Sequence, residues 1–255
     1  MKSRDAYARV ALVTGATSGI GEATARSFVA AGFGVTGTGR NADKLKQLEA
    51  ELGEAFKGVA GDIAEGGTVD RLFVATAEKF GRMPDIVVAN AGRGLGGSVK
   101  DADLSRFESI LQINVTGTLA LLQRAAREML PQQERGYPDT AADILVLGSV
   151  VGRHVSPFSA VYGATKFAVH ALTEGLRREL GPKGVRVTLI APGITVSGFQ
   201  DAAGYSDAMV QNFEDKFGPL LVAEDVAETI RYTVSLPPRV HVSDLVVRPT
   251  RQDYP

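Results

Sequence analysis

Residues 14–21 read Thr-Gly-Ala-Thr-Ser-Gly-Ile-Gly and join an apolar run, Val10–Thr14, to a helical pattern that starts at Gly19. A glycine-rich turn that opens directly into a helix lets a pyrophosphate approach bare backbone N–H groups at the positive end of the helix dipole. The spacing is Gly-x-x-x-Gly-x-Gly, which departs from the Gly-x-Gly-x-x-Gly fingerprint of many dinucleotide folds. Glycines that serve packing alone are the alternative, but three of them in one turn favour a cofactor. We therefore expect this turn to bind a dinucleotide through Gly15, Thr17, Ser18, Gly19, Ile20 and Gly21.

Outward from this turn, short runs of Val, Ile and Leu alternate with longer amphipathic stretches, the pattern of a parallel sheet with crossover helices. The predicted strands are Val10–Thr14, Gly34–Thr38, Ala55–Ala60, Ile86–Ala89, Ile144–Gly148, Val185–Ile190 and Leu245–Val247. The predicted helices are Gly19–Ala31, Ala42–Leu52, Thr68–Phe80, Leu104–Leu130, Ala160–Leu180 and Glu224–Ser235. Gly32, Gly53, Gly81 and Gly181 follow four of these helices and are predicted to end them.

No Pro/Gly/Ser-rich linker divides this alternation, which predicts one α/β domain over residues 1–255. Two stretches depart from the pattern. Gln132–Asp143 is expected to be a polar loop. Residues 192–219 follow a strand on the side where open α/β sheets bind ligands, so we expect a substrate lid there.

Composition narrows the function classes. The 28 basic and 29 acidic residues give a net charge of -1, so the protein has no excess positive charge to attract nucleic acid or an anionic membrane. There is no cysteine and only three histidines, so disulfides, thiolate metal sites and a cysteine nucleophile are excluded and we expect no metal. No run of 18 apolar residues occurs, and we expect a cytoplasmic protein.

The end of the second strand bears on which nicotinamide cofactor binds. An acidic residue there binds the adenosine ribose of NAD, whereas a nearby arginine accommodates the 2′-phosphate of NADP. Here Gly39 stands where the acid is expected and Arg40 follows it, which favours NADP over the alternative that Arg40 is a solvated cap of the next helix. Asp62 and Ile63, after the third strand, are candidates for the adenine edge, and a solvated turn is an equal alternative for the carboxylate.

Further candidates follow the fourth and fifth strands. Asn90, Ala91 and Gly92 are small enough for a cofactor to lie against their backbone. Ser149 ends the fifth strand, and Tyr162 and Lys166 share one face of the following helix because they are four residues apart. An ammonium beside a phenol stabilises the phenolate and lowers the pKa of the phenol. Taken alone, the Tyr–Lys spacing is also that of an ordinary amphipathic edge.

Together and in this order, Thr14-Gly15-x-x-x-Gly19-x-Gly21, Asn90-Ala91-Gly92, Asn114, Ser149, Tyr162-x-x-x-Lys166 and Pro192-Gly193 resemble the short-chain dehydrogenase/reductase superfamily over the whole chain. The resemblance implies a Rossmann-type sheet of seven parallel strands, in the order 3-2-1-4-5-6-7, with helices on both faces. It also implies a nicotinamide cofactor and a homodimer or homotetramer.

The resemblance assigns roles to individual residues. Tyr162 would be the general acid/base, Lys166 would bind the nicotinamide ribose and lower the pKa of Tyr162, and Ser149 would bind the substrate oxygen. Asn114 would hold a water that links Lys166 to a proton relay. After Pro192 and Gly193, the resemblance places Ile194 and Thr195 at the carboxamide and Ser197 at a phosphate.

We therefore expect an NADP(H)-dependent oxidoreductase that interconverts an alcohol and a carbonyl. The tail Leu236–Thr250 lacks the Val-Asp-Gly-Gly ending of many 3-oxoacyl-ACP reductases and resembles the serine-type 3-hydroxy acid dehydrogenase and clavulanate-type reductase branch. This favours a small 3-hydroxy acid or a polar aldehyde or ketone, with Arg93, Arg153 or His154 as carboxylate partners. The loop residues expected around the nicotinamide also include Leu95, Phe158, Phe199 and Tyr205. A 3-oxoacyl-ACP-type reductase and a catalytically silent NADP(H) sensor or scaffold are the alternatives; His170 and His241 are interpreted as packing or surface residues.

Overall fold

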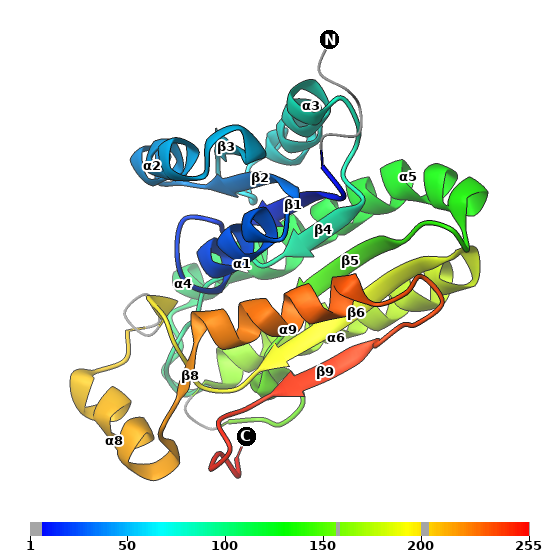
Figure 1. Ribbon diagram of the computed structural model, residues 1–255. Coiled ribbons are helices and arrows are strands. Elements are labelled where there is room, and N and C mark those ends of the chain that lie inside the picture. Colours follow the sequence, from blue (N-terminus) through cyan, green and yellow to red (C-terminus); the bar gives the residue numbers. More distant parts are fainter. Residues whose placement is uncertain (1–6, 157–158, 200–203, 255) are drawn as a thin grey trace.

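Seven parallel strands form the central sheet, in the order β3-β2-β1-β4-β5-β6-β9 (Figure 1). The computed structural model describes residues 7–156, 159–199 and 204–254. The strands are β1 (Val10–Thr14), β2 (Gly34–Gly39), β3 (Phe56–Ala60), β4 (Ile86–Ala89), β5 (Ala142–Leu147), β6 (Val185–Pro192) and β9 (Asp244–Val247). Because β9 is the seventh strand of this sheet along the chain, the predicted order 3-2-1-4-5-6-7 is confirmed.

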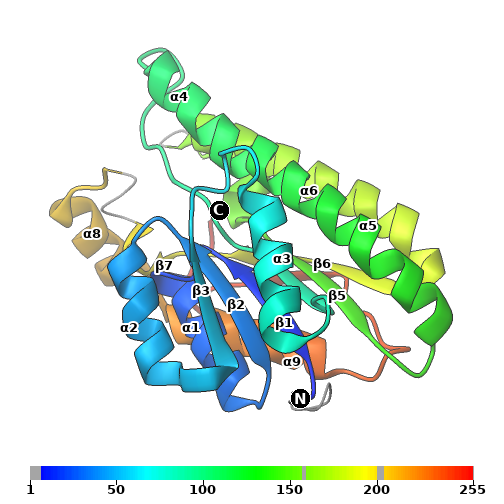
Figure 2. The ribbon, with the colours of Figure 1, turned by 90° about the horizontal axis from the view of Figure 1, so that it is seen from above.

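Helices cover both faces of the sheet (Figure 2). On one face lie α1 (Gly19–Ala30), α2 (Ala42–Leu52) and α9 (Ala223–Ser235), and on the other lie α3 (Thr68–Phe80), α5 (Thr118–Gly136) and α6 (Ala160–Leu180). A further helix, α4 (Leu104–Leu111), continues into α5 through a π-helical segment, Gln112–Gly117. No helix among the described residues is long and apolar enough to cross a membrane.

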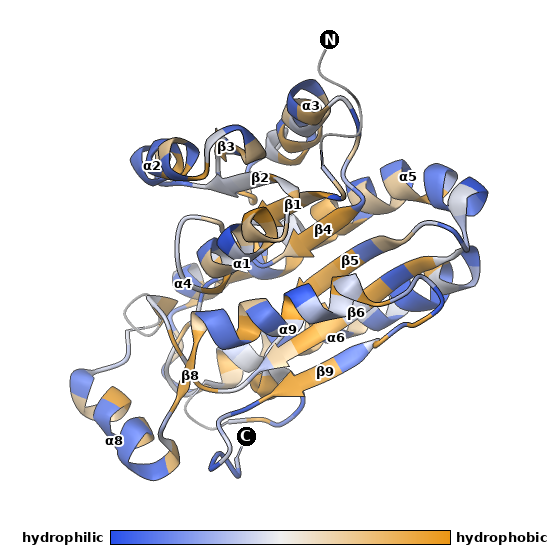
Figure 3. Ribbon diagram, viewed as in Figure 1, coloured by the Kyte–Doolittle hydropathy of each residue, from blue (hydrophilic) through white to orange (hydrophobic). Residues whose placement is uncertain are grey.

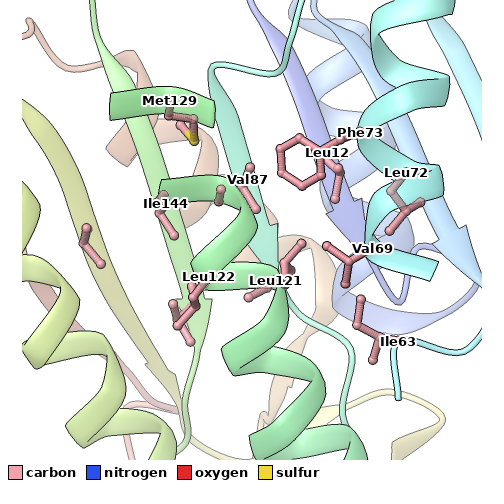
Figure 4. Close-up of a cluster of buried hydrophobic side chains, with 14 of the residues drawn as sticks. Leu12, Ile63, Val69, Leu72, Phe73, Val87, Leu121, Leu122, Met129 and Ile144 are labelled. Carbon is pink, nitrogen blue, oxygen red and sulfur yellow. The ribbon is translucent and has the colours of Figure 1, made fainter. Parts of the chain in front are cut away.

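Successive side chains of a strand point to opposite faces of the sheet, and the apolar ones form a hydrophobic core on each face. Val13 of β1 packs on the α1 face with Phe28, whereas its neighbour Leu12 packs on the α3 face with Phe73 (Figure 4). All four side chains are fully buried. The central strands β1, β4 and β5 are accordingly largely orange, that is hydrophobic, in Figure 3, as expected of a parallel sheet covered on both faces.

Two local predictions were wrong. The helix predicted to end at Leu130 runs on through Pro131 to Gly136, so only the second half of the predicted 132–143 loop is non-helical. Proline removes one backbone donor, and Met129 and Gln133 on either side of it are buried and hold this turn in place. Gly181 is the C-cap residue of α6, which ends at Leu180 as predicted. A 3₁₀ turn, Gly181–Lys183, follows, and Gly184 after it has the left-handed conformation.

The predicted 192–219 region contains regular structure that its sequence pattern did not indicate. Two short strands, β7 (Thr195–Val196) and β8 (Leu221–Val222), pair with each other outside the main sheet. Between them lies α8 (Asp207–Phe217), which projects beyond the sheet next to β8 (Figure 1). Among the residues of α8, only Phe217 is buried, and the apolar repeat that could identify the helix is short: Met209, Phe213 and Phe217.

At the amino ends of the strands, four charged residues form an ionic network in which Asp143 and Arg186 are buried and Arg9 and Asp85 are partly buried. Arg186 of β6 binds both carboxylate oxygens of Asp143 in β5, at 2.7 and 2.8 Å. Arg9, directly before β1, donates to Asp143 at 2.9 Å and to Asp85, which directly precedes β4. The third guanidinium nitrogen of Arg186, Nη1, donates to the backbone carbonyls of Leu236, Pro237 and Val240. The network ties four strands and the segment after α9 together at one edge of the sheet.

Candidate functional site

A cavity of about 520 Å³ lies at the opposite edge, where the strands end. Its walls come from the turn after β1, the ends of β2, β4, β5 and β6, the start of α6, α8 and the C-terminal tail. The cavity is lined by most of the residues predicted from the sequence: Gly15, Thr17, Ser18, Gly19, Ile20, Arg40, Asp62, Ile63, Asn90, Ala91, Gly92, Ser149, Tyr162, Lys166, Pro192, Gly193, Ile194, Thr195 and Ser197. Gly21 and Asn114 lie directly behind the wall and contact residues that form it.

The β1–α1 turn presents the N-terminus of α1 to the cavity. Gly15 has φ +69°, a conformation that side-chain-bearing residues rarely adopt. Ser18 is the N-cap residue, yet its side chain makes no capping hydrogen bond. The turn is held from the other side by the Asn90 side chain, which donates to the Thr14 carbonyl at 2.9 Å. The first N–H groups of α1 are therefore positioned to bind an anion, and the fit to a pyrophosphate is good.

At the end of β2, any side chain at position 39 would force Thr17 to move. A Cβ on Gly39 would lie 2.5 Å from both Oγ1 and Cγ2 of Thr17. Arg40 is exposed and lines the cavity. The side chain of Asn41, not of Arg40, caps α2 by accepting from the Lys44 N–H at 3.0 Å. The alternative in which Arg40 serves as the helix cap was therefore wrong.

Asp62 and Ile63 lie in the loop after β3 and line the same part of the cavity. The Asp62 carboxylate accepts the Ala64 N–H at 3.0 Å, which is a local turn. Asp62 therefore both forms a local turn and lines the cavity. The two roles considered from the sequence, a turn residue and a contact for the adenine edge, do not exclude each other.

The predicted catalytic residues come together where β5 ends against α6. The hydroxyl of Ser149 is hydrogen-bonded to the phenol of Tyr162. Lys166 lies one helical turn after Tyr162, donates from Nζ to the Leu147 carbonyl at 2.7 Å, and has Nζ 5.9 Å from the centre of the Tyr162 ring. Tyr162 and Lys166 are both buried. Three groups able to bind or exchange protons with a carbonyl oxygen therefore share one enclosed corner.

Burial determines the protonation states of Tyr162 and Lys166, and the predicted lowering of the Tyr162 pKa was wrong. Burial raises the pKa of Tyr162 above its usual value, and the hydrogen bond from Ser149 offsets this only in part. The sequence predicted a lowered pKa because it identified Lys166 as a neighbour but did not reveal how completely the phenol is buried. Burial also lowers the pKa of Lys166 to about 8. The phenol is consequently protonated near neutral pH and is a proton donor.

Asn114 lies in the π-helical segment between α4 and α5, a feature often found at functional sites. Its side-chain oxygen accepts the Arg93 N–H at 2.8 Å, and its side-chain nitrogen donates to the Arg93 carbonyl at 2.9 Å and to Thr165 at 3.0 Å. The side chain thus holds the backbone after Gly92 against α6. A Cβ on Gly92 would lie 3.1 Å from the Asn114 oxygen, so this packing is close.

The residues predicted around the substrate divide into two groups. Arg93, Phe199 and Tyr205 line the cavity, and Leu95 is buried in the apolar cluster around Tyr162. Arg153 instead forms an ion pair with Asp244, and His154 is exposed and outside the cavity lining, so these two carboxylate partners were wrong. Phe158 lies outside the described residues.

Two parts of the wall were missed by sequence reasoning. One face of α8 contributes Met209, Asn212, Phe213, Lys216 and Phe217. The C-terminal tail contributes Gln252, which accepts the Ile194 N–H at 2.9 Å, and Tyr254, whose hydroxyl donates to the Val155 carbonyl. The apolar residues Met209, Phe213 and Phe217 are four residues apart, and this spacing could have predicted α8 from the sequence. The tail carries no comparable signal.

Comparisons with known proteins agree with this geometry. A family model described as short chain dehydrogenase matches residues 9–206. An uncharacterized oxidoreductase of Staphylococcus epidermidis is 32% identical over 94% of this chain and 97% of its own length. The closed form of a serine dehydrogenase complexed with NADP⁺ superposes with a TM-score of 0.82 at 31% identity, covering 96% of both chains. A 3-ketoacyl-(acyl-carrier-protein) reductase from Brucella melitensis complexed with NADH gives 0.86 at 28% identity, covering 97% of this chain and 99% of the other.

The chain belongs to the short-chain dehydrogenase family. The family assignment makes it an oxidoreductase, and solved relatives bound to NADP⁺ and to NADH support a nicotinamide cofactor.

Proposed function

We propose that this protein is an NADP(H)-dependent oxidoreductase that interconverts an alcohol and a carbonyl, with Tyr162 as general acid/base. The observation that carries the proposal is the buried cluster of Ser149, Tyr162 and Lys166 in the cavity that also contains the N-terminus of α1. The nicotinamide supplies or accepts the hydride when bound. The chain's own residues hold the substrate oxygen and exchange its proton.

In the reductive direction, the protonated Tyr162 phenol donates its proton to the carbonyl oxygen as that oxygen gains negative charge. Ser149, already hydrogen-bonded to the phenol, binds the same oxygen and orients it. Lys166 lies beside the phenol and stabilises the phenolate left after the transfer. Asn114 keeps the wall after Gly92 in place, and we propose that it also supports the relay that returns a proton to the site.

The preference for NADP over NAD rests on Gly39 and Arg40. An acidic side chain at position 39 would repel a 2′-phosphate, and the close contact with the Thr17 side chain favours the glycine found there. Arg40 adds an exposed guanidinium at the same edge of the cavity, suited to a phosphate. The other cofactor contacts predicted from the sequence are also part of this proposal: Asp62, Ile63, Asn90, Ala91, Gly92, Tyr162, Lys166, Pro192, Gly193, Thr195 and Ser197.

Two substrate classes remain. The 31% identity to a serine dehydrogenase and the cation Arg93 in the wall support a small 3-hydroxy acid or a polar carbonyl. The apolar side chains Phe199 and Phe213 favour a second class, a ketone or aldehyde with a bulky apolar body. The Phe199 ring centre lies 5.4 Å from that of Tyr162, the general acid/base in this proposal. We propose that the region 192–219 acts as the substrate lid for either class. The cytoplasmic location and the homo-oligomer stay predictions.

The test is a panel of hydroxy acids, polar aldehydes, bulky apolar ketones and a 3-oxoacyl thioester, assayed by NADPH absorbance. Tyr162→Phe should lower kcat by about 10²- to 10⁴-fold and leave the Kd for NADPH nearly unchanged, because the phenyl ring keeps the packing and loses only the proton. Retained turnover in this variant would refute the role of Tyr162. NADPH binding without turnover on any member of the panel would favour the sensor or scaffold alternative.

A further inference from the structure

One face of α6 carries a third polar residue directed at the end of β5. Tyr162, Lys166 and His170 follow one another at intervals of four residues and therefore lie on one side of the helix. Tyr162 is hydrogen-bonded to the Ser149 hydroxyl, and Lys166 donates to the Leu147 carbonyl. His170 accepts the backbone N–H of Ser149 at Nε2, at 3.3 Å. The side chain and the backbone of Ser149 are thus both bound by α6.

The Ser149 N–H needs this acceptor because the strand ladder has ended. Pairing of β5 with β6 stops at Leu147, and the Gly148 N–H still reaches the Ile190 carbonyl at 2.7 Å. The next residue, Ser149, turns away from the sheet and becomes the N-cap of a 3₁₀ turn, Val150–Gly152. A buried backbone donor left without a partner is costly, and the imidazole takes the place of the missing strand.

Two glycines make the space for this ring. A Cβ on Gly148 would lie 2.3 Å from Nε2 of His170, and a Cβ on Gly152 would lie 2.6 Å from the same atom. A Cβ at either position would force the imidazole to move, so the glycines at 148 and 152 are matched to the ring as it lies here. The ring is consequently held close to the backbone that it binds.

The ionisation of His170 fits an acceptor. Burial lowers the pKa of His170 to about 4, and the nearby cations Arg153 and Lys166 act in the same direction, while Asp244 opposes them. The ring is therefore neutral near neutral pH. Because Nε2 accepts the Ser149 N–H, the proton of the neutral ring is on Nδ1.

We infer that His170 is a positioning residue that fixes the backbone of Ser149 and thereby aims its hydroxyl at Tyr162 and at the substrate oxygen; this inference rests on the proposed function. Tyr162, Lys166 and His170 act together as one helical face that holds the segment Leu147–Ser149 through its side chain and its backbone. The chemistry depends on this segment because a displacement of about 1 Å at a reacting group can cost 10²-fold in rate.

The test compares two replacements of His170 that differ in whether they can accept a hydrogen bond. His170→Gln keeps an acceptor oxygen at a similar reach, whereas His170→Leu fills the space without one. We expect His170→Leu to lower kcat by about 10- to 100-fold with the Kd for NADPH unchanged, and His170→Gln to restore most of the loss. His241→Leu is the matched control, because His241 is also half-buried and contacts the Val187 carbonyl away from the cavity; its kcat should equal that of the wild type.

A second readout does not depend on turnover. Amide hydrogen exchange at Ser149 should be slow in the wild type and in His170→Gln and faster in His170→Leu. Gly148→Ala should reproduce the loss of kcat, and combining it with His170→Leu should cause little further loss because both remove the same hydrogen bond. Equal kcat in the Gln and Leu variants, or exchange at Ser149 that is the same in all of them, would overturn the inference. If exchange changes as expected while no panel substrate turns over, the hydrogen bond stands, but the proposed function and the catalytic role given to Ser149 fail.

Discussion

The two edges of the sheet treat polar groups in opposite ways. At the amino edge, the buried charges of Asp143 and Arg186 and the partly buried charges of Arg9 and Asp85 are paired with one another. At the carboxyl edge, the buried Lys166 has no carboxylate partner among the described residues, and its one recorded hydrogen bond is to a carbonyl. Burial there favours the neutral forms of Tyr162 and His170.

This difference separates stability from function. A buried charge that is paired within the protein has its hydrogen bonds and its counter-ion already in place, so it does not bind a ligand. A buried group without a counter-ion retains its capacity to bind a ligand or exchange a proton. Ligands of open α/β sheets bind outside the carboxyl ends of the strands, which is the edge that remains unsatisfied here. Substitutions at the two edges should therefore have separable effects on stability and on activity.

The largest effect is expected from Asp143→Asn at the amino edge. The new amide NH₂ would face a guanidinium donor, and Arg9 and Arg186 would lose their shared buried charge partner. Breaking a buried pair from one side costs about 3–5 kcal/mol, so the urea midpoint should fall accordingly. The kcat of the protein that remains folded should be unchanged. A lower kcat with unchanged stability would contradict the separation of the two edges.

At the carboxyl edge, Lys166→Met should have the reverse outcome. Lys166 has a folded-state pKa of about 8 against 10.5 normally, so its charged form carries a burial cost below pH 8. Between these values the unfolded chain holds a proton that the folded chain releases, and the stability of the wild type rises with pH.

Replacing Lys166 by methionine should raise the unfolding free energy near pH 7 by about 1–3 kcal/mol, after allowing for the lost hydrogen bond to Leu147, and should abolish turnover. The difference from the wild type should shrink as the pH rises toward 10.5, which denaturant titrations at several pH values would measure. A variant less stable than the wild type near pH 7 would show that this ammonium stabilises the fold.

Most of the fold could be predicted from the sequence because it depends on local pattern. Each strand is an apolar run bounded by a turn, and the family motifs fix the order of the strands. The exception, α8, has one buried residue, Phe217, and only a short apolar repeat, Met209, Phe213 and Phe217. Its position depends on what it covers, which a local pattern does not contain.

The residue types at the site were also predictable, whereas their environment was not. The contact between Gly39 and Thr17 joins two segments of the chain, and only the fold brings them together. Tyr162 was recognised, but the sign of its pKa shift depends on burial. His170 was interpreted as a packing or surface residue, because the sequence could not reveal that the sheet ladder ends before the N–H of Ser149.

A smaller effect is expected for Arg40→Ala, which removes an exposed charge from the carboxyl edge. Loss of one charge-assisted contact in an exposed position should weaken NADPH binding by about 1–2 kcal/mol, or roughly 5- to 30-fold, and leave NADH binding unchanged. Isothermal titration with both cofactors measures this selectivity. Lys46→Ala is the control, since Lys46 lies on α2 outside the cavity lining. Equal weakening of both cofactors would refute the 2′-phosphate assignment.

The smallest effect concerns acid stability. His170 has a folded-state pKa of about 4 against 6.5 normally, so between these values the unfolded chain takes up a proton that the folded chain excludes. The stability contribution of the neutral ring is therefore full above pH 6.5 and is lost as the pH falls toward 4. Because the ring is only half-buried, we expect about 1 kcal/mol from this source. His170→Gln should flatten the pH dependence of the unfolding free energy by that amount. An unchanged slope would mean that His170 is protonated as readily in the folded protein as in the unfolded chain. Burial at the carboxyl edge would then not favour the neutral form of His170, which would contradict the difference between the two edges.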